Sequence, residues 1–85
     1  LEQDFAENYL WRVYNGLGRI NSNIGKLETA EAYYRKAYDI AVAMSERGTA
    51  DCIENLASSC DDLGGVYVTR GDYETAREYY LKSLD

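Results

Sequence analysis

The 85-residue chain contains no histidine and no proline, and it has only two cysteines and one methionine. Without histidine, the serine–histidine and cysteine–histidine nucleophilic sites are excluded, as are zinc sites that use an imidazole ligand. Two cysteines are too few to hold a structural zinc ion on their own. Strand-rich chains of this size usually show regular clusters of proline, glycine and asparagine at their turns. Their absence favours an all-α fold.

Basic residues and long apolar runs are also scarce. Nine bases stand against 15 acids, a net charge of −6, whereas duplex binding depends on clustered Lys and Arg. The longest notable apolar run is 40–44, far short of the roughly 20 residues that cross a bilayer. We therefore expect no nucleic-acid partner, no membrane partner, no metal and no cofactor. The chain does not begin with Met, and we expect it to be one domain, 1–85, of a longer protein.

The two cysteines, Cys52 and Cys60, lie eight positions apart. On a helix this spacing separates them by about 12 Å along the axis, whereas a disulfide needs Cα atoms within about 7 Å. We expect both to be free thiols, buried as small apolar side chains. Free thiols favour a reducing, cytoplasmic setting.

An internal repeat becomes visible when residues 11–39 are laid over residues 57–85. Ten of the 29 aligned positions are identical without a gap. The matches include Leu17-Gly18 with Leu63-Gly64, Gly25 with Gly71, and 28–30 with 74–76. The chain therefore consists of two copies of one structural unit.

Apolar residues recur every three or four positions through both copies, the spacing of one face of a helix. This periodicity predicts four helices at 4–23, 27–46, 50–69 and 73–85, with repeat one at about 4–47 and repeat two at about 49–85. The predicted buried faces are Phe5, Tyr9, Val13, Leu17, Ile20 and Ile24; Leu27, Ala30, Tyr34, Ala37, Ala41 and Met44; Ile53, Leu56, Cys60, Leu63 and Tyr67; and Tyr73, Ala76, Tyr80 and Ser83/Leu84.

Helix ends are predicted from capping chemistry. Asp4 with Glu7 fits a capping box at the first helix, and Gly25 and Gly71 suit the left-handed residue that ends a helix. Asp72 can cap the fourth helix, whereas Lys26 at the matching position cannot cap the second. Thr49 is the expected cap of the third helix. Short links make each helix pair antiparallel.

These residues resemble the tetratricopeptide repeat family. Its pattern has an aromatic residue, Leu-Gly, a second aromatic, a turn Gly, and Ala followed four positions later by an aromatic. The matching positions here are Tyr14, Leu17, Gly18, Asn21, Gly25, Ala30, Tyr34 and Ala37, then Cys60, Leu63, Gly64, Tyr67, Gly71, Ala76, Tyr80 and Ser83. The expected fold is two stacked antiparallel helix hairpins, a fragment of an α–α superhelix. Close helix approach is expected at Gly18 and Gly64, opposite Ala30 and Ala76, with Tyr34 and Tyr80 filling the space between hairpins.

The resemblance has three departures from the family pattern. The repeat spacing is 46 residues where about 34 is usual, so longer helices are expected. The closing proline is absent, and Asn21 and Cys60 replace aromatic residues. The fourth helix has no counterpart of 40–47, which should leave the third helix partly uncovered.

The resemblance implies a concave groove, lined by the first and third helices, that binds a protein or peptide segment. Arginine and amide groups there suit carboxylates and peptide backbone, and Arg is common among binding hot spots. The leading Lys and the paired Asn with which family members clamp a terminal carboxylate are missing, which disfavours chaperone docking. Carried onto this sequence, the groove residues are Arg12, Asn15, Arg19, Ser22 and Asn23 with Ser58, Asp61, Gly65, Val68 and Thr69.

Other interpretations of these residues stay open. Arg12 and Arg19 could be an ordinary solvated face. Asp51, Glu54, Asp61 and Asp62 could suggest an enzyme or metal site, but Asp61 and Asp62 point about 100° apart on a helix, so no enzyme is expected. The nine tyrosines should be mostly core, with Tyr38 and Trp11 as the better interface candidates. The alternative function is self-assembly through uncovered helix faces, which would give a homo-oligomer.

Overall fold

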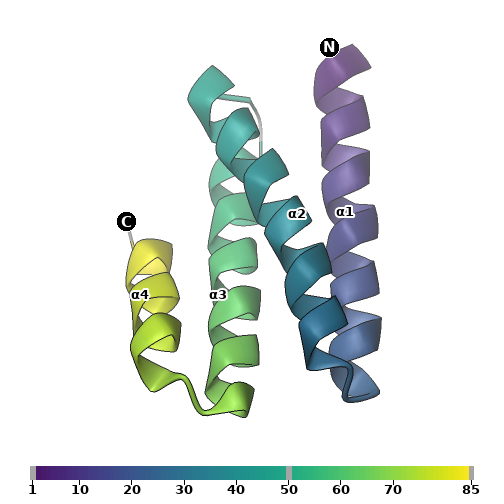
Figure 1. Ribbon diagram of the computed structural model, residues 1–85. Coiled ribbons are helices and arrows are strands. Elements are labelled where there is room, and N and C mark those ends of the chain that lie inside the picture. Colours follow the sequence, from purple (N-terminus) through teal and green to yellow (C-terminus); the bar gives the residue numbers. More distant parts are fainter. Residues whose placement is uncertain (1, 50, 85) are drawn as a thin grey trace.

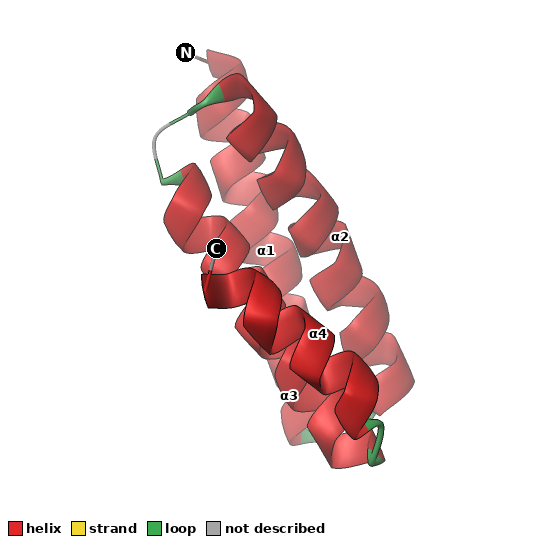
Figure 2. Ribbon diagram, turned by 90° about the vertical axis from the view of Figure 1, so that its left-hand side faces the viewer, coloured by secondary structure: helices red, strands yellow, loops and turns green. Residues whose placement is uncertain are grey.

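The computed structural model describes residues 2–49 and 51–84, and within that part of the chain it is helical throughout apart from short turns. The helices are α1 (Glu2–Asn23), α2 (Leu27–Arg47), α3 (Cys52–Arg70) and α4 (Tyr73–Leu84). Figure 2 shows that loops are confined to the connections between successive helices. The predicted all-α fold is confirmed, with helix bounds within two residues of the expected ones.

The helices pack in chain order, each on the next, and α1 also touches α3 along a narrow line. They form a flat, elongated stack of 40 × 26 × 13 Å with α1 at one edge and α4 at the other (Figure 1). Consecutive helices run in opposite directions, as the short links require. The two hairpins α1–α2 and α3–α4 are therefore stacked side by side, with α2 against α3.

Glycine in the left-handed conformation ends the first and third helices, as predicted. Gly25 has φ 85° and Gly71 has φ 84°, a region open to glycine because it has no Cβ. At the start of α4, Asp72 Oδ1 accepts a hydrogen bond from the Thr75 backbone N–H at 3.2 Å. Lys26, at the same place before α2, makes no capping hydrogen bond with its side chain. The predicted asymmetry between the two hairpin turns is confirmed.

Two predicted caps are wrong. Helix α1 already begins at Glu2, so Asp4 lies inside the helix and cannot be its cap; its side chain is outside the described residues. Glu7 pairs with Arg47 at the end of α2 instead. The Thr49 hydroxyl donates to the Met44 carbonyl oxygen at 3.2 Å, so it closes the end of α2. Helix α3 begins after Asp51, which has φ 66° and makes no side-chain capping bond.

The glycine and tyrosine of the repeat motif meet inside each hairpin. Tyr34 also packs in the core cluster with Leu63 and Val66 of the next hairpin, as expected, whereas Tyr80 is 41% exposed. A Cβ on Gly18 would lie 2.6 Å from Tyr34 Cδ1, and one on Gly64 would lie 2.8 Å from Tyr80 Cε1. Each ring thus occupies the space that a side chain on the glycine would need. The aromatic ring, and not alanine alone, makes the close contact between paired helices.

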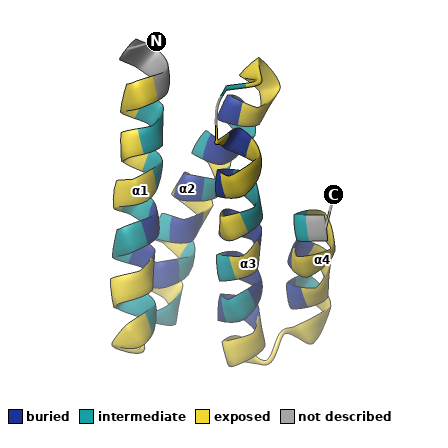
Figure 3. Cartoon of the chain, turned by 180° about the vertical axis from the view of Figure 1, so that it is seen from behind, coloured by how far each residue is buried: buried dark blue, intermediate teal, exposed yellow. Residues whose placement is uncertain are grey.

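The core lies on α2, α3 and the inner side of α4. The predicted face of α2 is confirmed, because Ala30, Tyr34, Ala37, Ala41 and Met44 are all buried and Leu27 is half-buried. Figure 3 shows this concentration of buried residues in α2 and α3 and the exposed residues along much of α1. The principal core cluster is Ala30, Tyr34, Leu63, Val66, Tyr67, Ala76 and Tyr79.

The predicted buried face of α1 is wrong. Its large apolar residues are exposed, and only Leu17 among them is half-buried. The residues that contact α2 and α3 are mainly polar or small, because that side of the helix carries Glu7, Asn15 and Gly18. Exposed fractions on the predicted face are 77% for Phe5, 60% for Tyr9, 37% for Val13, 59% for Ile20 and 62% for Ile24.

The short fourth helix leaves part of α3 uncovered, as expected. Ile53 is 79% exposed, so its predicted burial is wrong. The predicted burial of Tyr73 and Tyr80 on α4 is also wrong, because these residues are 68% and 41% exposed. A hollow of about 140 Å³ lies beside Ile53 and Lys82, where α4 does not reach. Both cysteines are buried and free, as their spacing predicts.

Candidate partner-binding groove

The predicted groove residues lie on the sides of α1 and α3 that flank the line where these helices meet. Arg12 and Arg19 are exposed on α1, one above the other along the helix. Asn15 between them is only 6% exposed, so it lies beneath the surface and not on it. Of the remaining residues, Asn23, Ser58, Asp61, Val68 and Thr69 are exposed, and Ser22 and Gly65 are half-buried.

A ladder of polar pairs joins α1 to α3 beneath this surface. Trp11 Nε1 donates to Ser59 Oγ at 2.8 Å, and Asn55 Nδ2 donates to Asn8 Oδ1 at 2.9 Å. Asn15 makes a hydrogen bond with the Asp62 carboxylate, one turn further along both helices. Because these pairs advance together along both helices, α1 and α3 run parallel with a polar floor between them.

The Asp62 carboxyl is the acidic group of this polar floor, and its pKa is raised. Burial raises the pKa of its carboxyl; the Arg19 guanidinium opposes that shift, Asp61 adds to it, and the hydrogen bond with Asn15 opposes it. The nearby Tyr34 hydroxyl also has a raised pKa, first because it is buried and then because Asp62 is close, while Arg19 acts in the opposite direction. The Arg19 charge and the Asp62 carboxylate are therefore close enough to interact across α1 and α3.

Several of the polar residues between α1 and α3 were not predicted from the sequence. Asn8, Asn55 and Ser59 interrupt apolar periodicity, and a polar residue on a buried face is the signal that could have revealed them. Trp11, expected as an interface residue, is half-buried and its indole N–H is already bonded to Ser59. It therefore joins α1 to α3 within the fold.

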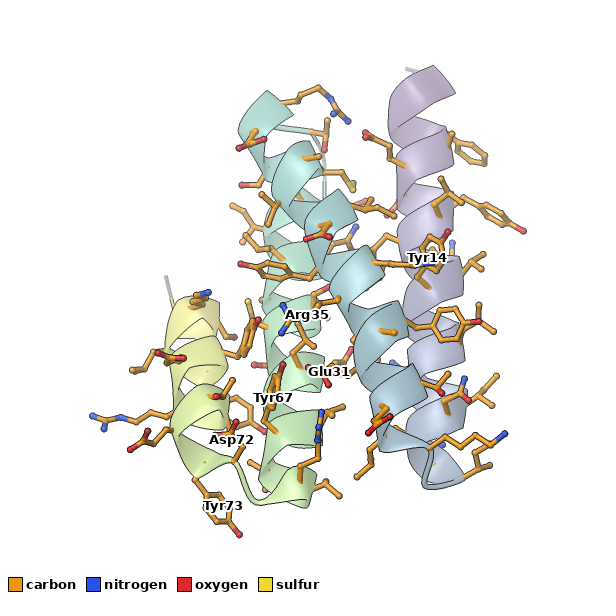
Figure 4. The ribbon with its side chains drawn as sticks, in the orientation of Figure 1. Tyr14, Glu31, Arg35, Tyr67, Asp72 and Tyr73 are labelled. Carbon is orange, nitrogen blue, oxygen red and sulfur yellow. The ribbon has the colours of Figure 1, made fainter. Side chains whose placement is uncertain are left out.

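A second polar cluster joins α2 to α3, away from the groove. The Tyr67 hydroxyl donates to Glu31 Oε2 and accepts from Arg35 Nη2 at 2.6 Å, while Arg70 pairs with Glu31 Oε1. Figure 4 shows Glu31 and Arg35 of α2 directed at Tyr67 of α3. Burial raises the pKa of Glu31, but the Tyr67 hydrogen bond and the Arg70 charge outweigh it, so the net shift is downward.

Most buried and half-buried tyrosines make ring contacts between helices. Tyr67 and Tyr79 stack with centroids 5.6 Å apart, and Tyr38 meets Tyr79 edge-on at 5.9 Å. Lys82 Nζ lies 4.9 Å from the centre of the Tyr79 ring. Tyr38, expected as an interface candidate, is thus engaged within the fold.

In the described part of the chain, the acidic residues do not gather into a metal site. Among residues 5–49 and 51–83, no three carboxylate or thiol side chains converge on a point that could hold a metal ion. Asp61 is exposed whereas Asp62 is turned toward α1, in keeping with their adjacent positions on a helix. None of the helices in the described part of the chain has the length and hydropathy of a membrane span.

Comparison with known families agrees with this geometry. The family model for the tetratricopeptide repeat matches residues 12–85, so the chain belongs to that family. Tetratricopeptide repeats are typically non-catalytic modules for interaction between proteins. No curated protein and no solved structure gives a significant match to the chain.

Proposed function

We propose that the chain binds an extended or helical segment of a partner protein along the groove between α1 and α3, as part of a larger cytoplasmic scaffold or regulator. The observation that supports this proposal is that Arg12 and Arg19 are both exposed on α1, and that Arg19 lies close enough to Asp62 of α3 to affect its pKa. At the matching positions α3 carries the small residues Ser58 and Gly65. The α3 side leaves room for a bound chain, and the α1 side offers two guanidinium groups. Guanidinium groups bind carboxylates with two parallel hydrogen bonds.

The proposed partner segment is acidic along one edge. Arg12 and Arg19 lie about two helical turns apart, or roughly 10 Å, so carboxylates at a similar separation can engage both. Asp61 on the facing side repels a second row of acids and favours a cation or a backbone amide there. The groove is therefore expected to bind preferentially a segment whose two edges carry charges of opposite sign.

Peptide display against the immobilised 85-residue chain tests the proposal. Selected peptides are expected to be enriched in Asp and Glu and to lose binding at least about tenfold, or 1.4 kcal/mol, on the Arg12→Glu/Arg19→Glu variant. A control variant, Lys26→Glu/Arg77→Glu, makes the same change in net charge at exposed positions outside the groove. Peptides held equally well by both variants would contradict the groove assignment.

A second candidate function is self-assembly. It is favoured by the exposed apolar residues of α1, whose centre lies roughly 80–100° around the helix from Arg12 and Arg19.

A further inference from the structure

Helix α1 carries an uncovered apolar face from Phe5 to Ile24, the residue that follows its last turn. Phe5, Tyr9, Val13, Ile20 and Ile24 are between 37% and 77% exposed. At 3.6 residues per turn these five positions fall within an arc of about 100°. Large contiguous apolar surfaces of this kind mark interaction sites. We call these five residues the α1 apolar face.

The second repeat shows what such a face packs against. The positions of α3 that match Tyr9, Val13 and Ile20 are Asn55, Ser59 and Val66. These three are at most 7% exposed, because α2 packs antiparallel on this side of α3 and α1 also borders it, through the bonds of Asn55 with Asn8 and of Ser59 with Trp11. The first repeat has more apolar residues at the same positions, yet no described residue covers them. The α1 apolar face is therefore suited to an antiparallel helix.

The surroundings of this face leave room for a helix. α1 lies at the edge of the stack, and its contacts with α2 and α3 are made from the opposite side of the helix (Figure 1). Gly16 falls within the same arc, and a Cβ placed there would meet nothing within 4 Å. A glycine in an exposed apolar face lets a second helix approach closely at its centre.

The order of residues along the α1 apolar face is self-complementary. If a second α1 is laid against it antiparallel, with Phe5 opposite Ile24, then Tyr9 falls opposite Ile20 and Val13 falls opposite Gly16. All three pairs share one register, and each matches a larger side chain with a smaller one. Because the arrangement is symmetric, every contact occurs twice, as a two-fold interface requires.

We propose that two copies of this chain pair through the α1 apolar face, with their α1 helices antiparallel about a two-fold axis near Val13 and Gly16. The face contains no charged residue between Phe5 and Ile24 within its arc. Arg12 and Arg19 lie beyond its edge, roughly 80–100° from the centre, where charges remain solvated and cost little. This inference deepens the self-assembly named above as the second candidate function, and it does not rest on peptide binding by the groove.

Sedimentation of the 85-residue chain over a concentration series up to about 1 mM tests the pairing, because a Kd near or below that value then populates the dimer. The mass is expected to rise from 9.6 kDa toward twice that value. Tyr9→Glu/Ile20→Glu is expected to weaken association at least about tenfold with helix content unchanged. The matched control Ile53→Glu/Leu81→Glu alters two equally exposed apolar residues elsewhere and should still associate.

Cross-linking tests the register. The Tyr9→Cys and Ile20→Cys variants are mixed and oxidised, with each variant alone and the unmodified chain as controls. The mixture is expected to form disulfide-linked dimers, whereas each variant alone is not, since like positions lie about 16 Å apart along antiparallel helices. A chain that stays monomeric, a dimer unaffected by Tyr9→Glu/Ile20→Glu, or linkage of Tyr9→Cys to itself would overturn the proposal.

Discussion

The ring of Tyr34 lies over Gly18, so that a Cβ on residue 18 would come within 2.6 Å of Tyr34 Cδ1. Tyr80 and Gly64 repeat this relationship in the second hairpin. In each hairpin, the tyrosine ring packs against the facing helix at a place where the glycine has no side chain. Close packing of this kind leaves no room for added atoms.

Gly18→Ala is expected to destabilise the chain by about 1–2 kcal/mol, since the overpacking cost of about 1–3 kcal/mol exceeds the gain from removing a helical glycine. Gly16→Ala is the matched control, because its Cβ would meet nothing within 4 Å. It should stabilise by about 0.5–1 kcal/mol. Urea unfolding followed by circular dichroism, at a concentration where the chain is monomeric, measures both. Equal effects at the two positions would refute the Gly18–Tyr34 contact.

The same logic applies to the second hairpin. Gly64→Leu is expected to lower the free energy of unfolding by about 1–3 kcal/mol through contact with Tyr80. An unchanged unfolding curve would mean that α3 and α4 do not meet at that position.

Glu31→Gln is expected to lower the free energy of unfolding by about 1 kcal/mol at neutral pH. Fully buried hydrogen bonds to charged groups contribute more than that, but Glu31 is partly exposed. The folded-state pKa of Glu31 lies below its usual value of 4.5. Its stabilisation is therefore fully present above about pH 4.5 and is lost as pH falls through the folded-state pKa. Thermal unfolding of both proteins between neutral and acid pH should show the difference shrinking. Glu28→Gln, at an exposed position of α2, should show no such trend.

Asp62→Asn is expected to change the free energy of unfolding at neutral pH in the opposite direction from Glu31→Gln. Burial raises the pKa of Asp62 above its usual value of 3.8, so its contribution favours folding at acid pH and is lost as pH rises through the folded-state pKa. Replacing it with a neutral amide should therefore stabilise the chain at pH 7, by less than about 1 kcal/mol because the site is only half-buried. The gain should vanish below pH 3.8. A variant less stable than the original at neutral pH would contradict this account of Asp62.

The turn before α4 has a side-chain cap and the turn before α2 has none, so the two turns allow a paired test of capping. Asp72→Ala removes the hydrogen bond to the Thr75 backbone N–H and is expected to cost about 1 kcal/mol. Lys26→Asp places the same carboxylate before α2, where no side-chain cap exists, and should stabilise by a similar amount. Chemical unfolding of both variants against the unmodified chain gives the two values; the same sign for both would contradict the assigned caps.

Much of the fold follows from local chemistry that the sequence displays directly. Gly25 and Gly71 mark helix ends because few other residues adopt a positive φ. Ala30, Tyr34 and Ala41 recur at helical spacing and are all buried. The repeat itself identifies equivalent positions, so evidence from one hairpin supports the other.

The orientation of α1 could not be predicted in the same way. Apolar periodicity identifies a face that avoids water, but it does not say whether this chain or another one covers it. The side of α1 that packs within the chain carries Asn8 and Asn15, whose hydrogen-bond partners Asn55 and Asp62 come from the other repeat. Contacts between residues nearly 50 positions apart leave no periodic signal.

The placement of Tyr34 over Gly18 and of Tyr80 over Gly64 bears on how such a chain could arise. Both partners of each contact lie within one 46-residue unit, so a gene duplication transfers them together and the new hairpin can close at once. Contacts between hairpins are not copied in this way. Glu31 and Arg70 form an ion pair, but their counterparts in the other copy are Arg77 and Ile24, which cannot form one. The hairpin is thus the heritable unit, whereas the junctions between hairpins had to diverge afterwards, one pair of residues at a time.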